Sequence, residues 1–267
     1  MATYVVTGAS CGIGLELCKQ ILAADATNKV YATVRAKENS STKEDLISPV
    51  VASSGGRLTV LEGIDISKDD VGVKLKAGLE GVTIDVLIHN AGSLSGHAPV
   101  REGAFAAGDV GGIMGGQSLG GTTMDAMRAC FEVNTLGPLR VQQALTAQMR
   151  SPGGKVGILS TGMGSIGDNG SGGVVPYRTS KAAVNMVGKC MACDLKKQEI
   201  AVALINPGGV FTEFAPDAIL KNIGAKPVDV AVRGVLKVLA NLTLETSGSG
   251  LIVAAPTDGS EPKPMPW

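Results

Sequence analysis

This chain of 267 residues contains few of the residues that mark several common classes of protein. Its aromatic content is 3%, and its 24 basic residues balance its 24 acidic residues. Without a basic excess, the chain has no electrostatic footprint for nucleic acid or for an anionic membrane surface. Its two histidines, His89 and His97, are not spaced as ligands on one helix face, and no Cys/His cluster indicates zinc, so we expect no metal site and a structural role for His89. These absences favour a small-molecule partner.

Two further absences concern the cell compartment. No apolar run reaches the roughly 18 residues of a membrane span, and the N-terminal segment reaches Gly8 before a signal peptide could be completed. The five cysteines are an odd number, which argues against a secreted disulfide framework. We therefore expect a cytoplasmic protein. Cys190 and Cys193 form a C-x-x-C motif inside an apolar helical stretch, where we expect core packing rather than a redox or metal role.

The sequence does contain a regular alternation of short Val/Ile/Leu runs with longer segments of helical period, which is typical of β-α-β units. The predicted strands are Thr3–Val6, Val30–Val34, Leu58–Leu61, Val86–Ile88, Val156–Leu159, Ala201–Ile205 and Leu251–Val253. The predicted helices are Ile13–Ala24, Thr42–Ser53, Ser67–Leu79, Met124–Met149, Tyr177–Lys197 and Val228–Leu239. The pattern predicts one α/β domain over residues 1–267: a doubly wound, seven-stranded parallel sheet with helices on both faces, the Rossmann fold.

Residues 93–122 do not fit an ordinary connection between these elements. This stretch of thirty residues contains nine glycines, which oppose a stable helix. Loops of this length inside a compact domain are usually functional or disordered. We interpret the segment as a Gly-rich insertion, and two roles remain open for it: a rim that helps to cover substrate, or a loop without catalytic consequence.

The stretch "VVTGASCGIG" places Thr7, Gly8, Gly12 and Gly14 between the first strand and the first helix. Glycine allows the tight turn and lets a phosphate approach the backbone, while the helix N-terminus offers unpaired N–H groups. A Gly-rich turn alone is a weak signal, but its place between strand and helix favours a dinucleotide site.

The end of the second strand indicates which dinucleotide. An NAD site would present Asp or Glu there for the adenosine ribose, whereas this chain has Val34 followed by Arg35. Because a guanidinium suits a 2′-phosphate, we expect NADP (NADPH) as the cofactor, with a solvated surface arginine as the alternative.

Tyr177 and Lys181, in "PYRTSKAAVNM", are four residues apart and share one face of the predicted helix. A nearby ammonium favours the phenolate and lowers the phenol pKa. Such a pair can give a proton to a carbonyl oxygen that receives hydride, or take one from an alcohol.

Three more motifs end on the same edge of the predicted sheet: "HNAG" with Asn90, "FEVNTLGP" with Asn134, and "INPGGVFT" with Pro207. In this order and with these spacings, the motifs resemble those of the short-chain dehydrogenase/reductase family, from Thr3 to about Val253. The resemblance implies the cofactor-binding residues Thr7, Gly8, Ser10, Cys11, Gly12, Ile13, Gly14, Arg35, Asp65, Ile66, Asn90, Ala91, Gly92, Tyr177, Lys181, Pro207, Gly208, Val210 and Thr212.

The resemblance also implies the catalytic roles. Tyr177 would be the acid/base, Lys181 would bind the nicotinamide ribose as well, and Asn134 would hold the water that relays protons through Lys181. The family has a serine at the end of its fifth strand, and "KVGILST" places Thr161 at that position, sixteen residues before Tyr177. The Thr161 hydroxyl can still donate to an oxyanion, whereas Ser160 is expected to point to the opposite face.

Two stretches, "MGSIGDNGSGG" and the ending "TDGSEPKPMPW", are similar to C-factor-like carbonyl reductases within the family. The resemblance implies NADPH-dependent reduction of an aldehyde or ketone to an alcohol, a small-molecule carbonyl substrate, and a homodimer or homotetramer. The alternative is an NADP-binding regulatory or signalling protein on the same fold without physiological turnover, which the threonine at the serine position and the long insertion motivate.

Overall fold

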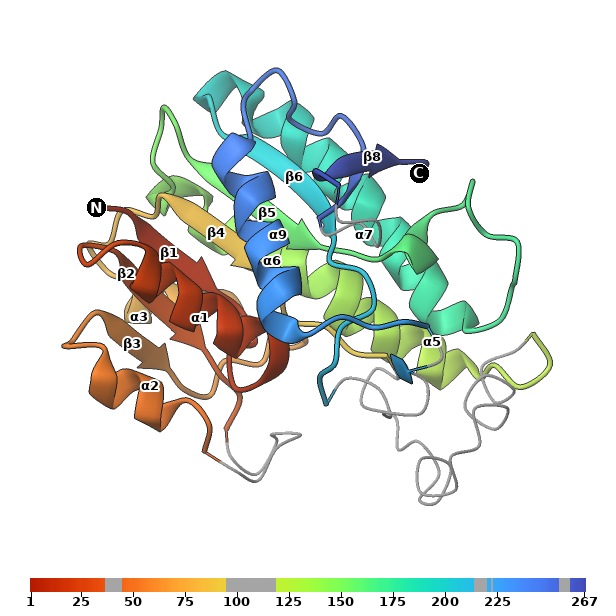
Figure 1. Cartoon of the computed structure of the whole chain (residues 1–267), viewed down its shortest axis with the longest axis horizontal. Coiled ribbons are helices and arrows are strands. Elements are labelled where there is room, and N and C mark those ends of the chain that lie inside the picture. Colours follow the sequence, from red (N-terminus) through yellow and green to blue (C-terminus); the bar gives the residue numbers. More distant parts are fainter. Residues whose placement is uncertain (37–44, 95–118, 214–219, 222, 255–259) are drawn as a thin grey trace.

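The computed structural model describes residues 1–36, 45–94, 119–213, 220–221, 223–254 and 260–267. Within these ranges, eight strands form one sheet in the order β3-β2-β1-β4-β5-β6-β7-β8 (Figure 1). The strands are β1 (Thr3–Val6), β2 (Lys29–Thr33), β3 (Leu58–Leu61), β4 (Val86–His89), β5 (Lys155–Leu159), β6 (Ala201–Asn206), β7 (Leu251–Val253) and β8 (Lys263–Met265). The helices are α1 (Gly12–Ala24), α2 (Ser48–Ser53), α3 (Val71–Gly78), α5 (Met124–Phe131), η2 (Glu132–Leu136), α6 (Gly137–Leu145), η3 (Thr146–Gln148), η4 (Gly162–Gly164), α7 (Val175–Asp194), η5 (Leu195–Gln198) and α9 (Val228–Asn241).

Strands β1 to β7 are parallel and confirm the predicted α/β doubly wound sheet. The order of the strands reverses between β1 and β4, which are paired through Val6 and Ile88. Ligands of such sheets bind in the crevice at this switch point. The sequence did not predict β8, which pairs antiparallel with β7 and carries the C-terminus (Figure 1).

Two hydrophobic layers cover the two faces of the sheet, because successive residues of a strand point to opposite sides. Val6 belongs to the layer of α1 and α9, and Val5 to the layer of α3, α6 and α7. The same alternation separates Ile88 from Leu87. Both faces of the central strands are therefore buried, as their continuous apolar runs predict.

Several helix bounds differ from the prediction. The helix predicted at Met124–Met149 is divided into α5, the π-helix η2, α6 and the 3-10 helix η3. Helix α3 begins at Val71 instead of Ser67, because Ser67 is held in a turn by Asp65. Of the helix predicted at Thr42–Ser53, residues 42–44 lie outside the described residues, and α2 begins at Ser48.

Helix α7 lies unusually close to the sheet at Gly188. A Cβ atom at this position would lie 2.7 Å from Leu204 Cδ2 and 2.9 Å from Ile158 Cδ1. Glycine is thus required for α7 to pack against β5 and β6 at this distance. The close packing brings the face of α7 that carries Tyr177 and Lys181 down to the carboxyl end of β5.

Candidate active site

The turn between β1 and α1 is shaped by glycine. Gly8 and Gly12 adopt positive φ angles of 69° and 54°, which side chains oppose. A Cβ at Gly14 would collide with the carbonyl oxygen of Gly8, so this turn admits no larger residue there. The side chain of the N-cap residue Cys11 makes no capping hydrogen bond. The N-terminal N–H groups of α1 therefore point to a site suited to a phosphate.

Asn90 joins this turn to the end of β4. Its Nδ2 donates to the carbonyl oxygens of Thr7 and Gly8, both at 2.9 Å. The Thr7 hydroxyl oxygen accepts from the main-chain N–H groups of Asn90 at 3.1 Å and Ala91 at 3.2 Å. The predicted phosphate turn and the Asn90–Gly92 motif thus form one hydrogen-bonded unit at the switch point of the sheet.

Burial raises the pKa of the Cys11 thiol in this turn, and the Glu213 carboxylate raises it further. Arg35 lies close enough to the turn for its charge to oppose that rise. Thr212 also contacts the turn, since a Cβ at Gly12 would lie 3.3 Å from its side chain. The structure therefore brings three separate predictions, Gly12, Arg35 and Thr212, to one place.

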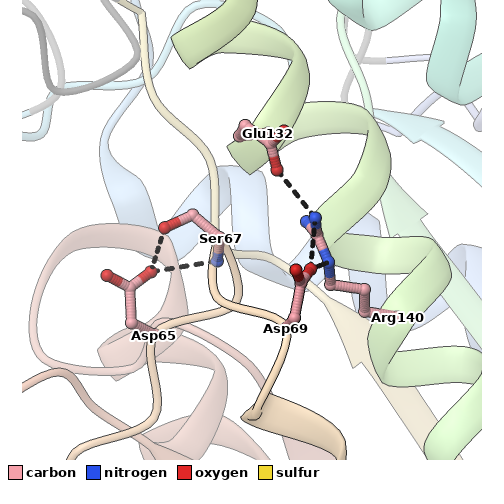
Figure 2. A network of polar contacts seen from close by, with 5 residues as sticks. All are labelled: Asp65, Ser67, Asp69, Glu132 and Arg140. Atoms are coloured by element: carbon pink, nitrogen blue, oxygen red, sulfur yellow. Dashed lines mark hydrogen bonds and ion pairs between the residues drawn. The ribbon is translucent and has the colours of Figure 1, made fainter.

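The loop after β3 holds Asp65 and Ile66, which were predicted to contact adenine. Asp65 Oδ1 accepts hydrogen bonds from the N–H and the hydroxyl of Ser67, at 3.0 and 2.7 Å (Figure 2). The Ile66 side chain is buried against Gly137 of α6. This packing leaves the main chain of Ile66 as the part that a ligand could contact.

A salt-bridge network joins the loop after β3 to helix α6. Arg140 contacts Asp69 and Glu132, each at 2.8 Å (Figure 2). Asp69 belongs to the loop after β3, whereas Glu132 is the first residue of the π-helix η2. The network connects the predicted adenine site to the turn that carries Asn134.

Tyr177 and Lys181 meet Thr161 at the carboxyl end of β5. The ammonium Nζ of Lys181 donates to the carbonyl oxygen of Leu159 at 2.8 Å and lies 5.9 Å from the centre of the Tyr177 ring. Burial lowers the pKa of Lys181 to about 8. The expectation that Lys181 lowers the pKa of Tyr177 is not met, because burial raises that pKa well above 10 and the opposing effect comes from the Thr161 hydroxyl. The phenol is thus protonated at neutral pH in the cofactor-free protein.

The hydroxyl groups of Thr161 and Ser160 make different hydrogen bonds. The Thr161 hydroxyl oxygen accepts from the N–H of Met163 at 3.2 Å, which leaves its proton for another acceptor. The Ser160 hydroxyl donates to Asn185 Oδ1 at 2.6 Å in the core. Ser165 is also buried and accepts from the N–H of Asp168 at 3.1 Å. Of these three hydroxyls, the one joined to Tyr177 is that of Thr161.

Asn134 lies in the π-helix and is fully buried. Its Nδ2 donates to the carbonyl oxygen of Ser93 at 2.8 Å and to the Ser180 hydroxyl at 3.0 Å, and its Oδ1 accepts from the N–H of Ser93 at 2.8 Å. Its side chain is thus an anchor. In an α-helix, the main-chain carbonyl of Asn134 would accept a hydrogen bond from the N–H of the residue four positions later. That residue is Pro138, which has no N–H. That carbonyl is therefore the atom through which Asn134 could hold a water.

The loop after β6 contains the predicted residues Pro207, Gly208, Val210 and Thr212. Gly208 adopts a positive φ of 84°, and its N–H donates to Asn206 Oδ1 at 2.9 Å. Val210 pairs with Lys226 in an isolated bridge. The loop turns back in this way toward Gly12, whose turn the Thr212 side chain contacts.

Sequence reasoning missed Cys130, Ser93 and Ser180 as neighbours of the site. The Cys130 thiol is buried and close enough to Tyr177 and Lys181 to influence the pKa of both. Its own pKa is raised to about 11 by burial. Spacing could have found two of them, because Cys130 precedes Asn134 by four residues and Ser180 follows Tyr177 by three.

Two other predictions have different outcomes. The expectation that Cys190 and Cys193 pack in the core is wrong, because both lie on the exposed face of α7. The structural role expected for His89 is consistent with its burial and its 3.2 Å contact with Gln142. Among the described residues, no group of three or more His, Cys, Asp or Glu side chains could hold a metal ion. Residues 95–118 of the Gly-rich insertion lie outside the described residues.

The described part of the chain has no helix that is long and apolar enough to cross a membrane.

Comparison with known proteins agrees with this geometry. The family model of the short chain dehydrogenases matches residues 2–222. The chain is 33% identical over 250 residues to 1-hydroxy-2-glutathionyl-2-methyl-3-butene dehydrogenase of Rhodococcus sp. (strain AD45), covering 93% of this chain and 95% of that protein. It is 35% identical over 167 residues to C-signal of Myxococcus xanthus, covering 62% of this chain and 86% of that protein.

The fold is also shared with solved structures. A Burkholderia multivorans protein assigned to the short-chain dehydrogenases/reductases and crystallised with NADP has a TM-score of 0.76 and 27% identity, covering 100% of this chain and 99% of that chain. An NADPH-bound carbonyl reductase from chicken fatty liver has the same TM-score at 24% identity, and the match covers 100% of this chain and 99% of that chain. The chain belongs to the short-chain dehydrogenase/reductase family of oxidoreductases and resembles its C-factor-like carbonyl reductases.

Proposed function

We propose that this chain reduces an aldehyde or ketone to an alcohol with NADPH as the cofactor. The observation that carries the proposal is the meeting of Thr161, Tyr177 and Lys181 at the edge of the sheet where the phosphate turn lies. The residues present fit the cofactor: the glycine turn at the uncapped N-terminus of α1 suits its pyrophosphate, and Arg35 suits a 2′-phosphate.

Bound NADPH would supply the hydride that the carbonyl carbon accepts. Tyr177 gives its hydroxyl proton to the carbonyl oxygen, so that hydride and proton together convert the carbonyl to an alcohol. The raised pKa of Tyr177 suits this direction, because the phenol enters the reaction with its proton. Thr161 donates a second hydrogen bond to the same oxygen as negative charge develops there.

Lys181 returns a proton to Tyr177 after each turnover. With a pKa lowered by burial to about 8, its amine can both lose and regain a proton near neutral pH. Asn134 connects this relay to solvent through a water on its main-chain carbonyl, which Pro138 leaves without an α-helical donor. Its side chain meanwhile holds Ser93 and the end of β4 in place.

The test is NADPH oxidation, followed by absorbance, with a panel of aldehydes, quinones and ketones. Tyr177→Phe should remove nearly all turnover and leave NADPH binding within a few fold, because it removes the transferred proton alone. Arg35→Asp should lower the preference for NADPH over NADH. Full activity of Tyr177→Phe would contradict the proposed role of the phenol.

The second candidate is a nucleotide-binding signalling protein without physiological turnover. The similarity to a protein named C-signal favours it. It predicts that NADPH binds while the whole panel of carbonyl compounds gives no absorbance change. Turnover that depends on Tyr177 would reject it.

We also propose that the chain forms a homodimer or homotetramer through α5 and α7. The outer face of α7 presents Met186, Cys190 and Cys193 to solvent, and all three are apolar or weakly polar. A surface of this kind suits contact with a second copy. Sedimentation as a monomer at micromolar concentration would reject the proposal.

A further inference from the structure

The C-terminal strand β8 touches both loops that frame the proposed reaction. Its Met265 lies against Gly162, where a Cβ would be 3.4 Å from Met265 Cε. The same side chain accepts a hydrogen bond on its sulfur from Asn206 Nδ2 at 3.4 Å. Gly162 directly follows Thr161, and Asn206 directly precedes Pro207. One methionine thus contacts the ends of β5 and β6 at the site.

The chain continues from β8 along the segment that follows Thr161. The carbonyl oxygen of Trp267 accepts from the N–H of Gly167 at 2.7 Å. Pro266 lies against the same residue, since a Cβ at Gly167 would be 3.1 Å from Pro266 Cβ. The last two residues therefore support the middle of the connection between Thr161 and Tyr177.

Arg178 holds the other side of this connection. Its guanidinium donates to the carbonyl oxygens of Gly172 and Gly173, at 3.1 and 3.0 Å, and it contacts the carbonyl oxygen of Met163 at 3.5 Å. The connection then enters α7 through Val174, whose φ of 48° is rare for a β-branched residue. The segment from Gly162 to Val174 is thus shaped by contacts at both ends.

Two exposed apolar side chains lie on the segments that meet at Gly167. Ile166 is 78% exposed and Trp267 39%, and the hydrogen bond from the Gly167 N–H to the Trp267 carbonyl oxygen joins their segments. Trp267 is the single tryptophan of a chain with 3% aromatic residues, and part of it is in contact with solvent. Exposed apolar side chains on adjoining segments are typical of a binding surface.

We propose that Trp267 is a specificity-determining residue, and that the segment from Lys263 to Trp267 forms an apolar wall for a substrate whose group beyond the carbonyl is flat and apolar, such as an aryl ring. The proposal rests on the proposed reductase function. Trp267 and Ile166 contact the aryl group, while Met265 is a positioning residue that holds Gly162, and through it Thr161, at the reaction site.

The test compares two aldehydes, benzaldehyde and glycolaldehyde, with the full-length protein and NADPH. Trp267→Ala should lower kcat/KM for benzaldehyde about tenfold, mainly through KM, and change that for glycolaldehyde less than about twofold, since a lost apolar contact affects the aryl substrate alone. Trp267→Phe keeps a flat ring and should restore most of the loss. Met265→Ala should lower kcat for both aldehydes, whereas Val73→Ala, a comparable truncation of an exposed apolar side chain on α3, should alter neither.

An unchanged ratio of the two kcat/KM values in Trp267→Ala would overturn the proposal while the reductase function stands. If wild-type protein reduces neither aldehyde, the reductase function is decided by the wider panel of carbonyl compounds, and the wall is tested by binding. Trp267 is the single tryptophan of the chain, so its emission reports on this place alone. Quenching by benzyl alcohol but not by glycerol would support the wall, and no response to either would overturn it.

Discussion

Asn134 and Ser93 exchange two hydrogen bonds of 2.8 Å across a sequence separation of 41 residues. Ser93 takes part through its main chain, whereas Asn134 takes part through its side-chain amide. The residue expected to serve the proton relay is therefore also the anchor for the start of the Gly-rich insertion. Its loss should be felt in folding as well as in turnover.

Asn134→Ala should lower the free energy of unfolding by about 2–3 kcal/mol, because it removes three hydrogen bonds and leaves the half-buried N–H and carbonyl of Ser93 without their partner. Turnover should fall with it. Ser93→Ala is the matched control, since it keeps the N–H and carbonyl that Asn134 binds, and it should be nearly neutral. Urea unfolding of both variants measures the difference, and equal losses would show that the two bonds do not act as described.

Thr161 should tolerate exchange for serine and not for valine. Thr161→Ser keeps the hydroxyl, so its kcat should lie within about threefold of wild type or above it. Thr161→Val removes the donor at the reacting oxygen, for which a loss of about 10²-fold is typical. Ser160→Ala should have a much smaller effect on kcat, because that hydroxyl donates to Asn185 in the core. The reverse order would assign the catalytic hydroxyl to Ser160.

His89 should make the protein less stable in mild acid. Burial lowers its folded-state pKa from 6.5 to about 4. Between these pH values the unfolded chain binds more protons, so stability falls as the pH falls from 6.5 toward 4 and is unaffected by this group above that window. At pH 5 the loss relative to pH 7 should be about 2 kcal/mol. Urea unfolding at both pH values should show a smaller difference in His89→Gln, and an unchanged difference would exclude His89 as the cause.

Thiol reactivity should separate the five cysteines. Cys190 and Cys193 are exposed and should react rapidly with Ellman's reagent. Burial raises the pKa of Cys18 to about 12 and of Cys130 to about 11. Both thiols should therefore react only after the protein has unfolded. Cys11 should react slowly with the reagent. It should react more slowly still when NADP is bound, because Cys11 lies in the turn that we expect to bind the phosphates. The double variant C190S/C193S should lose the rapid phase, and rapid labelling that persists in it would place another thiol at the surface.

The sequence predicted the seven parallel strands and the places of Tyr177 and Lys181, because buried strands and helix faces have simple periods. It did not predict β8, since Pro264 and Pro266 disfavour a strand. An edge position next to β7 accepts them, because in the described part of the chain β8 pairs with β7 alone and no strand on its other side needs their missing N–H groups. The break in the long helix has a sequence signal in Pro138, which removes one helical hydrogen bond.

The cysteine prediction failed for a different reason. The apolar stretch around Cys190 and Cys193 gives a helix, but the periodicity does not state which face meets the sheet. Gly188 decides this, because only the face without a side chain at that point can pack against Leu204 and Ile158. The buried face is the one with the smallest residue, and its hydropathy alone would not identify it.

Because α7 packs closely on the sheet at Gly188, its two faces tolerate amino-acid substitution to different degrees. Any larger residue at Gly188 would lift the helix and move Lys181 away from the carbonyl oxygen of Leu159. Substitutions at Met186 or Cys190, on the outer face, would leave that distance untouched. A change on the outer face can therefore alter the surface of the helix without moving the proposed site, whereas a larger residue on the inner face would displace that site from two turns away.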